Sequence, residues 1–386
     1  MKKRHHSELR FDEISRRSAL LGLAASAFLP VKSWALEDYP YPYTRKLGVM
    51  SGGPLKAVAL QGVTFNVPNL EQGLGFYQSL YGLRIQAHQG KSAILRIGDG
   101  PYFIKMVEAT GRPDFECPVI SIKDFDAERV KKVLADLDVP SEIRYRTAEN
   151  GGGGPGAPNG TPELFFKDLD GLEYQIQDTA YAGGAGLRGD VVKLEPMTDR
   201  VKNAVFHAKT LNHTTNFYTD NVKTIDFFQK IFDINIMVIQ GTGAYLGAGD
   251  RFLFGAVKVP RPSITHFAVG IDNYNDAEVM KKLYAFGLEA AGGQAGGTID
   301  GKDPNRVGRP LTAANIPRQW GAYGGGLDVP FGTSQTEIWD ANGVMTHVQD
   351  VAYKGGAGYK GDILPPVGST ETVYRPPNWH PYGAKK

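Results

Sequence analysis

The chain has 386 residues, of which 41% are hydrophobic and 22% are charged, and its formal net charge is +2. This composition is typical of a globular protein long enough for two domains, and it excludes a fibrous or wholly disordered chain. Residues 1–35 hold seven of the 43 Lys/Arg and three of the 41 Asp/Glu, so the remainder carries a net charge of −2. A nearly neutral chain gives no electrostatic reason to bind nucleic acid or an anionic membrane.

The N-terminal segment has the pattern of an export signal. Arg16 and Arg17 form a twin-arginine pair before an apolar run at 19–31, and small residues follow up to Ala35. The apolar run is too short to span a bilayer comfortably, although a short membrane anchor is the alternative. We therefore expect residues 1–35 to be a cleaved twin-arginine signal peptide. The mature protein would be periplasmic or secreted and free of the membrane.

The remaining sequence is an internal duplication. Residues 180–190 read AYAGGAGLRGD and residues 352–362 read AYKGGAGYKGD, so the two motifs lie 172 residues apart. Near the start of each half, residues 69–83 parallel residues 220–234. Such self-similarity predicts two copies of one domain. We place the domains at 59–190 and 211–362, followed by a tail at 363–386 that is rich in Pro and aromatic residues.

Each half is predicted to contain two βαβββ units. In the first unit, a strand pattern at 60–67 precedes Asn69, which can cap an amphipathic helix, and three short strand patterns follow. The other units are marked by strand patterns at 119–122, 211–218 and 264–271, with helical patterns at 127–137, 222–232 and 275–286. The expected fold class is α+β, with four βαβββ units in two tandem domains. The glycine-rich stretch 292–334 interrupts the fourth unit and is expected to be a lid, a binding loop or disorder.

The four units resemble those of the vicinal oxygen chelate superfamily. The residues that carry the resemblance are Phe76-Tyr77 in the first helix and the sequence DLDG at 168–171 before a last strand. The superfamily includes glyoxalases, epimerases, antibiotic-resistance proteins and extradiol dioxygenases. Membership implies that two units form a half-open cup around a divalent metal. The metal ligands would come from the first strand of each unit and from the last strand of one or both.

By position, the resemblance implies that His213, His266 and His347 are the metal ligands. His347 stands four residues after Gly343, where the superfamily usually has Glu. Three imidazoles suit one divalent transition metal better than Mg²⁺ or Ca²⁺; Fe(II) is favoured, and Zn(II), Mn(II) or Cu(II) would also fit. Compared with a site of two His and one carboxylate, this site carries one more positive charge and should favour an anionic substrate or a metal-bound hydroxide.

The first half lacks such ligands. Its matching positions are Gly62, Cys117 or Pro118, and Gln175. We therefore predict that the first domain has no metal site and is a non-catalytic partner of the second. A minor alternative is that Gln61 and Gln175 are polar groups in an empty cup. Cys117 is the only cysteine and can form no intramolecular disulfide, so stability must come from packing.

This arrangement, with a non-catalytic first domain and a metal-binding second domain, resembles that of extradiol dioxygenases. This implies an exported metal-dependent enzyme that acts on a small aromatic or other bidentate oxygen substrate, with no nucleic-acid partner. A metal-dependent isomerase or lyase without redox chemistry is the alternative, as is a non-catalytic binding protein. A homo-oligomer is left open. The candidate acid–base residues are His207, Tyr218, Tyr245 and Tyr323, and Arg318 and Trp320 are candidates to close over the substrate.

Overall fold

The computed structural model describes residues 46–240, 243–288, 310–312, 336–340, 342–356, 360–362 and 364–369. All of these residues belong to one compact unit of the chain, Tyr43–Lys386. The predicted signal peptide, 1–35, lies outside the described residues, and of the predicted tail only 364–369 are included. Within the described part, no helix is long and apolar enough to cross a membrane.

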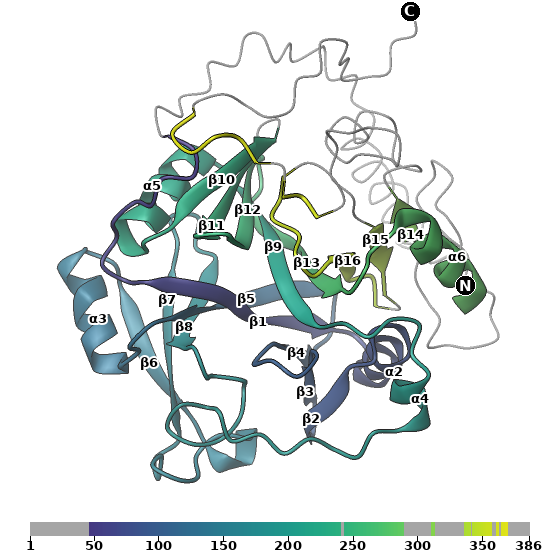
Figure 1. Cartoon of the computed structure of the whole chain (residues 1–386). Coiled ribbons are helices and arrows are strands. Elements are labelled where there is room, and N and C mark those ends of the chain that lie inside the picture. Colours follow the sequence, from purple (N-terminus) through teal and green to yellow (C-terminus); the bar gives the residue numbers. More distant parts are fainter. Residues whose placement is uncertain are drawn as a thin grey trace, which may run out of the picture. The chain divides into compact units, whose positions relative to one another are not determined.

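The first half of the chain forms an eight-stranded sheet in the order β2-β3-β4-β1-β5-β8-β7-β6 (Figure 1). Its strands are β1 (Ala57–Val67), β2 (Arg84–Gln89), β3 (Ser92–Arg96), β4 (Phe103–Glu108), β5 (Asp114–Ile122), β6 (Ser141–Arg146), β7 (Thr161–Lys167) and β8 (Glu173–Asp178). Its helices are α2 (Leu70–Tyr81), α3 (Ala127–Asp136) and the 3-10 turn η1 (Ala148–Asn150).

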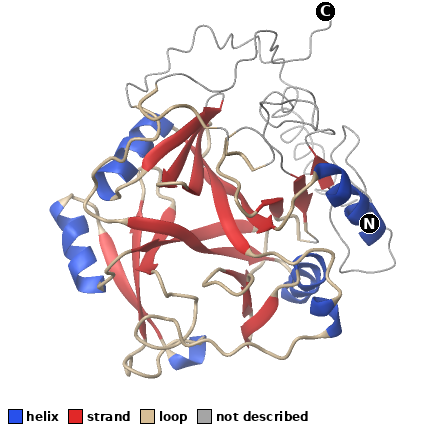
Figure 2. Ribbon diagram, in the orientation of Figure 1, coloured by secondary structure: helices blue, strands red, loops and turns tan. Residues whose placement is uncertain are grey.

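The second half forms another eight-stranded sheet, in the corresponding order β10-β11-β12-β9-β13-β16-β15-β14. Its strands are β9 (Thr210–Tyr218), β10 (Asn235–Gln240), β11 (Gly243–Ala248), β12 (Arg251–Lys258), β13 (Ser263–Ile271), β14 (Pro310–Thr312), β15 (Thr336–Trp339) and β16 (Met345–Asp350). Its helices are α5 (Asn221–Ile231) and α6 (Asp276–Phe286), and the short α4 (Asp199–Lys202) lies between the two sheets in sequence. The helices lie beside the sheets and not within them (Figure 2).

Strand pairing shows the same unit four times. In each unit the first strand runs parallel to the last, as in β1 with β4 and β13 with β16. Two units join into one sheet through their first strands, which are antiparallel in β1–β5 and β9–β13. The predicted α+β fold with four βαβββ units in two tandem halves is confirmed.

Local sequence explains where the repeated helices begin. The Asn69 side chain caps α2 by accepting a hydrogen bond from the backbone N–H of Gln72, 3.0 Å away. Asp220 caps α5 in the same way by accepting from the N–H of Lys223. Helix α2 ends at Gly82, whose φ of 67° is a left-handed conformation that glycine adopts without strain.

The glycine-rich stretch 292–334 differs in one respect from the expectation of an irregular loop. Residues Pro310–Thr312 within it form strand β14, which pairs with β15 at the edge of the second sheet. The interruption therefore contains a strand of the fourth unit, and three residues with little periodicity gave no sequence signal for it. The rest of this stretch, including Arg318, Trp320 and Tyr323, lies outside the described residues.

The faces of the two sheets opposite their cups pack against each other through aromatic rings. Phe65 of β1 stacks on Phe267 of β13 with ring centroids 5.5 Å apart, and Tyr77 of α2 lies about equally close to both rings, at 6.0 Å. Tyr174 of β8 contacts Phe228 of α5, with centroids 5.0 Å apart. Helices α2 and α5 thus each contact a strand of the other half, which couples the two sheets.

A buried carboxyl group strengthens this contact between the halves. The Tyr77 hydroxyl donates to Asp340 Oδ2 over 2.9 Å, and the backbone N–H groups of Asn342 and Val344 donate to Oδ1. Burial still raises the pKa of Asp340 to about 6. At neutral pH the carboxyl therefore needs all three donors.

Replacing Tyr77 with Phe should leave Asp340 Oδ2 buried without its donor. We expect the free energy of unfolding at pH 7.5 to fall by about 1–3 kcal/mol, measured by urea denaturation. Tyr284→Phe is the matched control, because Tyr284 is 51% exposed and its substitution should change stability little. Equal effects of the two substitutions would contradict the role given to Tyr77.

Candidate metal centre

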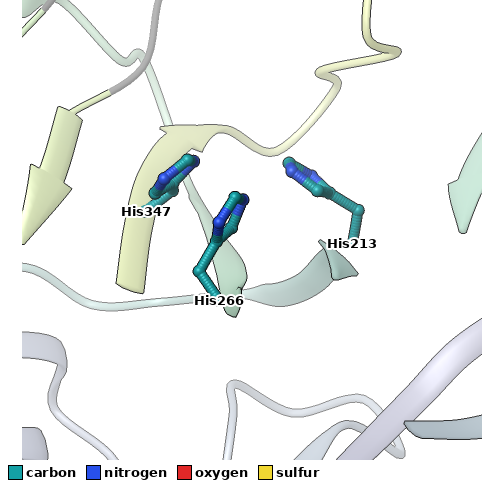
Figure 3. A group of neighbouring side chains, drawn as sticks. All are labelled: His213, His266 and His347. Carbon is teal, nitrogen blue, oxygen red and sulfur yellow. The ribbon is translucent and has the colours of Figure 1, made fainter. Parts of the chain in front are cut away.

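Three histidines converge on one face of the second sheet. His213 lies on β9, His266 on β13 and His347 on β16, and one ring nitrogen of each lies within 4.8 Å of the others. Figure 3 shows the three rings side by side, with His266 and His347 nearest each other. Their ring centroids are 3.6 Å apart, whereas His213 is 5.7 Å from His266 and 6.2 Å from His347.

The strand register explains this convergence. Ala268 of β13 is the partner of His213 on antiparallel β9 and of His347 on parallel β16. Paired residues project from the same face of a sheet, and His266 joins them because it precedes Ala268 by two residues. The buried Ala268 has only a methyl group, which leaves room between the flanking imidazoles. The pairing of β13 with β9 and β16 thus brings together three histidines that are far apart in sequence.

Burial favours the uncharged form of all three imidazoles. Their residues are 2–6% exposed, and loss of hydration lowers each pKa: to about 3 for His266 and well below its usual range for His213 and His347. Neighbouring histidines lower the pKa of His213 and His347 further. Neutral imidazole is the form that binds a metal ion.

The donor set fits a divalent transition metal. Imidazole nitrogen suits Fe, Zn, Cu and Mn, and the His266 Nε2 atom is buried with no hydrogen-bond partner among the described residues. Among these residues, the cluster contains no carboxylate. His213, His266 and His347 would together hold one ion and leave its other coordination positions open.

Aromatic rings line the His213 side of the cluster. Phe252 of β12 stacks on His213 with centroids 4.1 Å apart, and Tyr353 lies 6.1 Å from His213. Tyr245 of β11 packs edge-on against Phe252 at 5.1 Å. Phe252 and Tyr353 were not predicted from the sequence. Tyr353 lies in the duplicated motif at 352–362, which could have indicated a role near the cup.

The structure separates the four candidate acid–base residues. Tyr245 is half-buried and one ring removed from His213. Tyr218 is on the opposite face of β9, where its hydroxyl bonds the Tyr174 hydroxyl over 2.7 Å, so it is not brought to the cluster. His207 is exposed beside Gly82 at the end of α2, also away from the buried cluster. Tyr323 lies outside the described residues.

The positions in the first sheet that match the three histidines hold no comparable cluster. Register places Gly62, Val119 and Gln175 in the row that corresponds to His213, Ala268 and His347, and Cys117 takes the place of His266. Gly62 has no side chain, and the Phe103 ring fills the space where its Cβ would be.

The cup of the first sheet is filled by packed side chains. Phe103 and Val119 join Tyr181 in a buried hydrophobic cluster. The Tyr181 hydroxyl donates to Glu163, which forms a buried ion pair with Arg146 at 2.6 Å. Among the described residues, the second sheet therefore holds the cluster of potential metal ligands, and the first sheet has no counterpart of it.

Comparison with solved structures supports the fold assignment. A variant of homoprotocatechuate 2,3-dioxygenase from Brevibacterium fuscum matches with a TM-score of 0.52 and 13% identity, covering 81% of this chain and 75% of that chain. The 2,3-dioxygenase LapB from Pseudomonas sp. KL28 matches with 0.52 and 12%, covering 80% and 94%. The chain has the vicinal oxygen chelate fold.

A third solved structure also supports the assignment of this fold. The Mn(II)-bound glyoxalase from Novosphingobium aromaticivorans gives a TM-score of 0.50 at 11% identity, covering 79% of this chain and 85% of that chain. No protein-family model and no curated protein matches the sequence. At such low identity the matches establish the fold, and the chemistry has to be inferred from the residues of the site.

The neutral state of the histidines predicts how stability depends on pH in the presence of a chelator. The unfolded chain binds a proton at His266 below its ordinary pKa of 6.5, whereas the folded chain does so only near about 3. Stability should therefore fall as pH drops through this window, by up to about 1.4 kcal/mol per pH unit for this residue.

Urea unfolding of wild type and His266→Gln between pH 7.5 and 4.5 measures this contribution. The wild type should lose stability faster than the variant as pH falls. Asp168 and Asp340, whose pKa values burial raises to about 6, act in the opposite direction but are present in both proteins. Parallel pH curves would mean that His266 is not buried as a neutral group.

Proposed function

We propose that this chain is a metal-dependent enzyme of the vicinal oxygen chelate type, and specifically an extradiol-type dioxygenase for a small aromatic or other bidentate oxygen substrate. The observation that carries the proposal is the convergence of three neutral, buried histidines on one cup face. Three protein ligands leave positions for a substrate that binds through two oxygens.

The protein residues would supply binding, orientation and exclusion of water. His213, His266 and His347 would hold the ion, and Phe252, Tyr245 and Tyr353 would form an aromatic wall beside it. When bound, Fe(II) would supply redox chemistry with O₂, whereas Zn(II) or Mn(II) would supply Lewis-acid chemistry. The half-buried Tyr245 is the described candidate for proton transfer to or from the substrate.

The alternative is a non-redox isomerase or lyase, and the donor set favours it in one respect. Three uncharged ligands neutralise none of the ion's charge, so the site would attract electrons from a chelated oxygen pair more strongly than a site with a carboxylate. A non-catalytic binding protein is the third candidate. Metal identity and turnover distinguish the three.

Metal analysis tests the proposal directly. Elemental analysis of protein purified without chelators should find about one equivalent of iron, because three His ligands form one site. The His347→Ala variant should lose most of that metal, whereas His88→Ala should keep it, because His88 is a partly exposed residue on β2 of the first sheet.

The outcome also directs the assay. Iron in the wild type that is lost in His347→Ala should be accompanied by O₂ consumption with catechols. Zinc or manganese with turnover but no O₂ consumption would replace the dioxygenase with an isomerase or lyase. Absence of metal from the wild type, even after reconstitution, would overturn the metal-dependent enzyme.

Export by the twin-arginine route is a separate proposal, supported by residues 15–35 of the sequence. Replacing Arg16 and Arg17 by Lys keeps the charge but removes the paired guanidinium groups. We expect the precursor to accumulate in the cytoplasm, measured by fractionation and immunoblotting, while the wild type is found outside it. Unchanged export of the double variant would contradict this route.

A further inference from the structure

Asn212 makes two buried hydrogen bonds that determine the orientation of its side chain. Its Nδ2 donates to the backbone carbonyl of Tyr353 over 2.9 Å, and its Oδ1 lies 2.9 Å from His213 Nδ1. A carbonyl oxygen can only accept, so the amide nitrogen must face Tyr353. The amide oxygen, which also can only accept, then requires a proton on His213 Nδ1. The lone pair of the His213 ring is therefore on Nε2.

Thr265 determines the state of the second ring by the same reasoning. Its hydroxyl lies 3.0 Å from the backbone carbonyl of Thr215 and 3.0 Å from His266 Nδ1. The hydroxyl proton must be donated to the carbonyl, so at His266 the hydroxyl oxygen acts as an acceptor. His266 then carries its proton on Nδ1. Its Nε2 lone pair is buried with no partner among the described residues.

The first half shows which of these contacts belong to the scaffold. Gln61 occupies the position of Asn212, and its amide donates to the carbonyl of Tyr181 over 2.5 Å. This bond to the loop that follows the last strand is therefore present in both halves. Gln61 is followed by Gly62, and Glu116 stands at the position of Thr265. The contacts to imidazole Nδ1 are found in the half that carries the cluster.

We propose that Asn212 and Thr265 are positioning residues that hold His213 and His266 as Nδ1–H tautomers and present Nε2 of each to a divalent metal. The inference rests on the proposed metal site, and it adds which ring nitrogens bind and which side chains select them. Partners on the second nitrogen of a metal-binding His fix its tautomer and ring direction, and their removal typically costs 10–100-fold in metal affinity.

The tautomers can be measured without any metal. Long-range ¹H–¹⁵N correlation spectra of ¹⁵N-histidine-labelled protein at pH 7.5 with a chelator distinguish Nδ1–H from Nε2–H rings. Wild type should show His213 and His266 as Nδ1–H, with signals assigned by His→Gln variants. In Thr265→Val, His266 should become a mixture of the two forms. An Nε2–H ring at His266 in wild type would overturn the proposal whatever the metal content.

The Asn212 variants separate positioning from the scaffold bond. Asn212→Asp keeps an acceptor for His213 Nδ1–H but loses the donor to Tyr353, whereas Asn212→Leu loses both. We expect the Nδ1–H form of His213 to persist in the Asp variant and to be lost in the Leu variant. Loss in both would make Asn212 a scaffold residue only.

Affinity for Co(II), whose visible spectrum reports its coordination, completes the test. Thr265→Val should bind Co(II) about 10–100-fold more weakly than wild type, and Thr265→Ser, which retains the hydroxyl, should restore binding. The matched control is Thr214→Val, because the buried Thr214 hydroxyl has no partner in the described part of the chain and faces away from His213. Equal affinity of Thr265→Val and Thr214→Val would overturn the role of Thr265.

These outcomes separate the two proposals. A wild type that binds no metal but shows both Nδ1–H rings would defeat the proposed function and leave the assignment of the ring nitrogens intact. A wild type that binds Co(II) with the same affinity and spectrum as Thr265→Val would defeat the positioning role and leave the metal site intact.

Discussion

Burial of three uncharged imidazoles on one sheet face is the constraint on which the site depends. Each ring loses its hydration, and each buried ring nitrogen requires a partner or carries a desolvation cost. Asn212 and Thr265 provide acceptors for two of the Nδ1 atoms, and Phe252 covers one face of His213. One ring nitrogen of each histidine lies within 4.8 Å of the others, an arrangement that a metal ion would stabilise.

The duplication shows that the scaffold does not need this arrangement. The first sheet has the same strand order, yet the Phe103 ring fills the position of a histidine and the buried Arg146–Glu163 pair occupies its cup. Even the contacts between the halves differ: Asp340 has the Tyr77 hydroxyl as donor, whereas the residue of α5 that matches Tyr77 is Phe228, which has no hydroxyl to donate. The two halves therefore share the fold but differ in the residues that fill the cup.

Much of this structure could be predicted because its causes are local. Capping residues such as Asn69 and alternating patterns located the helices and strands. The resemblance to the vicinal oxygen chelate superfamily, applied through the spacing from Gly343, pointed to His347. The role of Tyr218 could not be judged from the chemistry of its side chain, but alternation along β9 places it on the face opposite His213. Phe252 could not be predicted, because a bulge at Leu253 brings it to the cup face. Strand β14 is too short to leave a periodic signal.

The buried carboxyl groups elsewhere in this protein suggest why position 347 holds a histidine in place of a carboxylate. Burial raises the pKa of Asp168 and Asp340 to about 6, even though backbone N–H groups donate to both. On the cup face, the His347 ring lies beside the His266 and His213 rings and is buried, so a carboxylate at its position would carry a desolvation cost as well. A neutral imidazole has a lower desolvation cost, because it carries no charge. The second sheet can therefore bury its ligands before an ion binds, and the ion would then retain its full positive charge toward a chelating substrate.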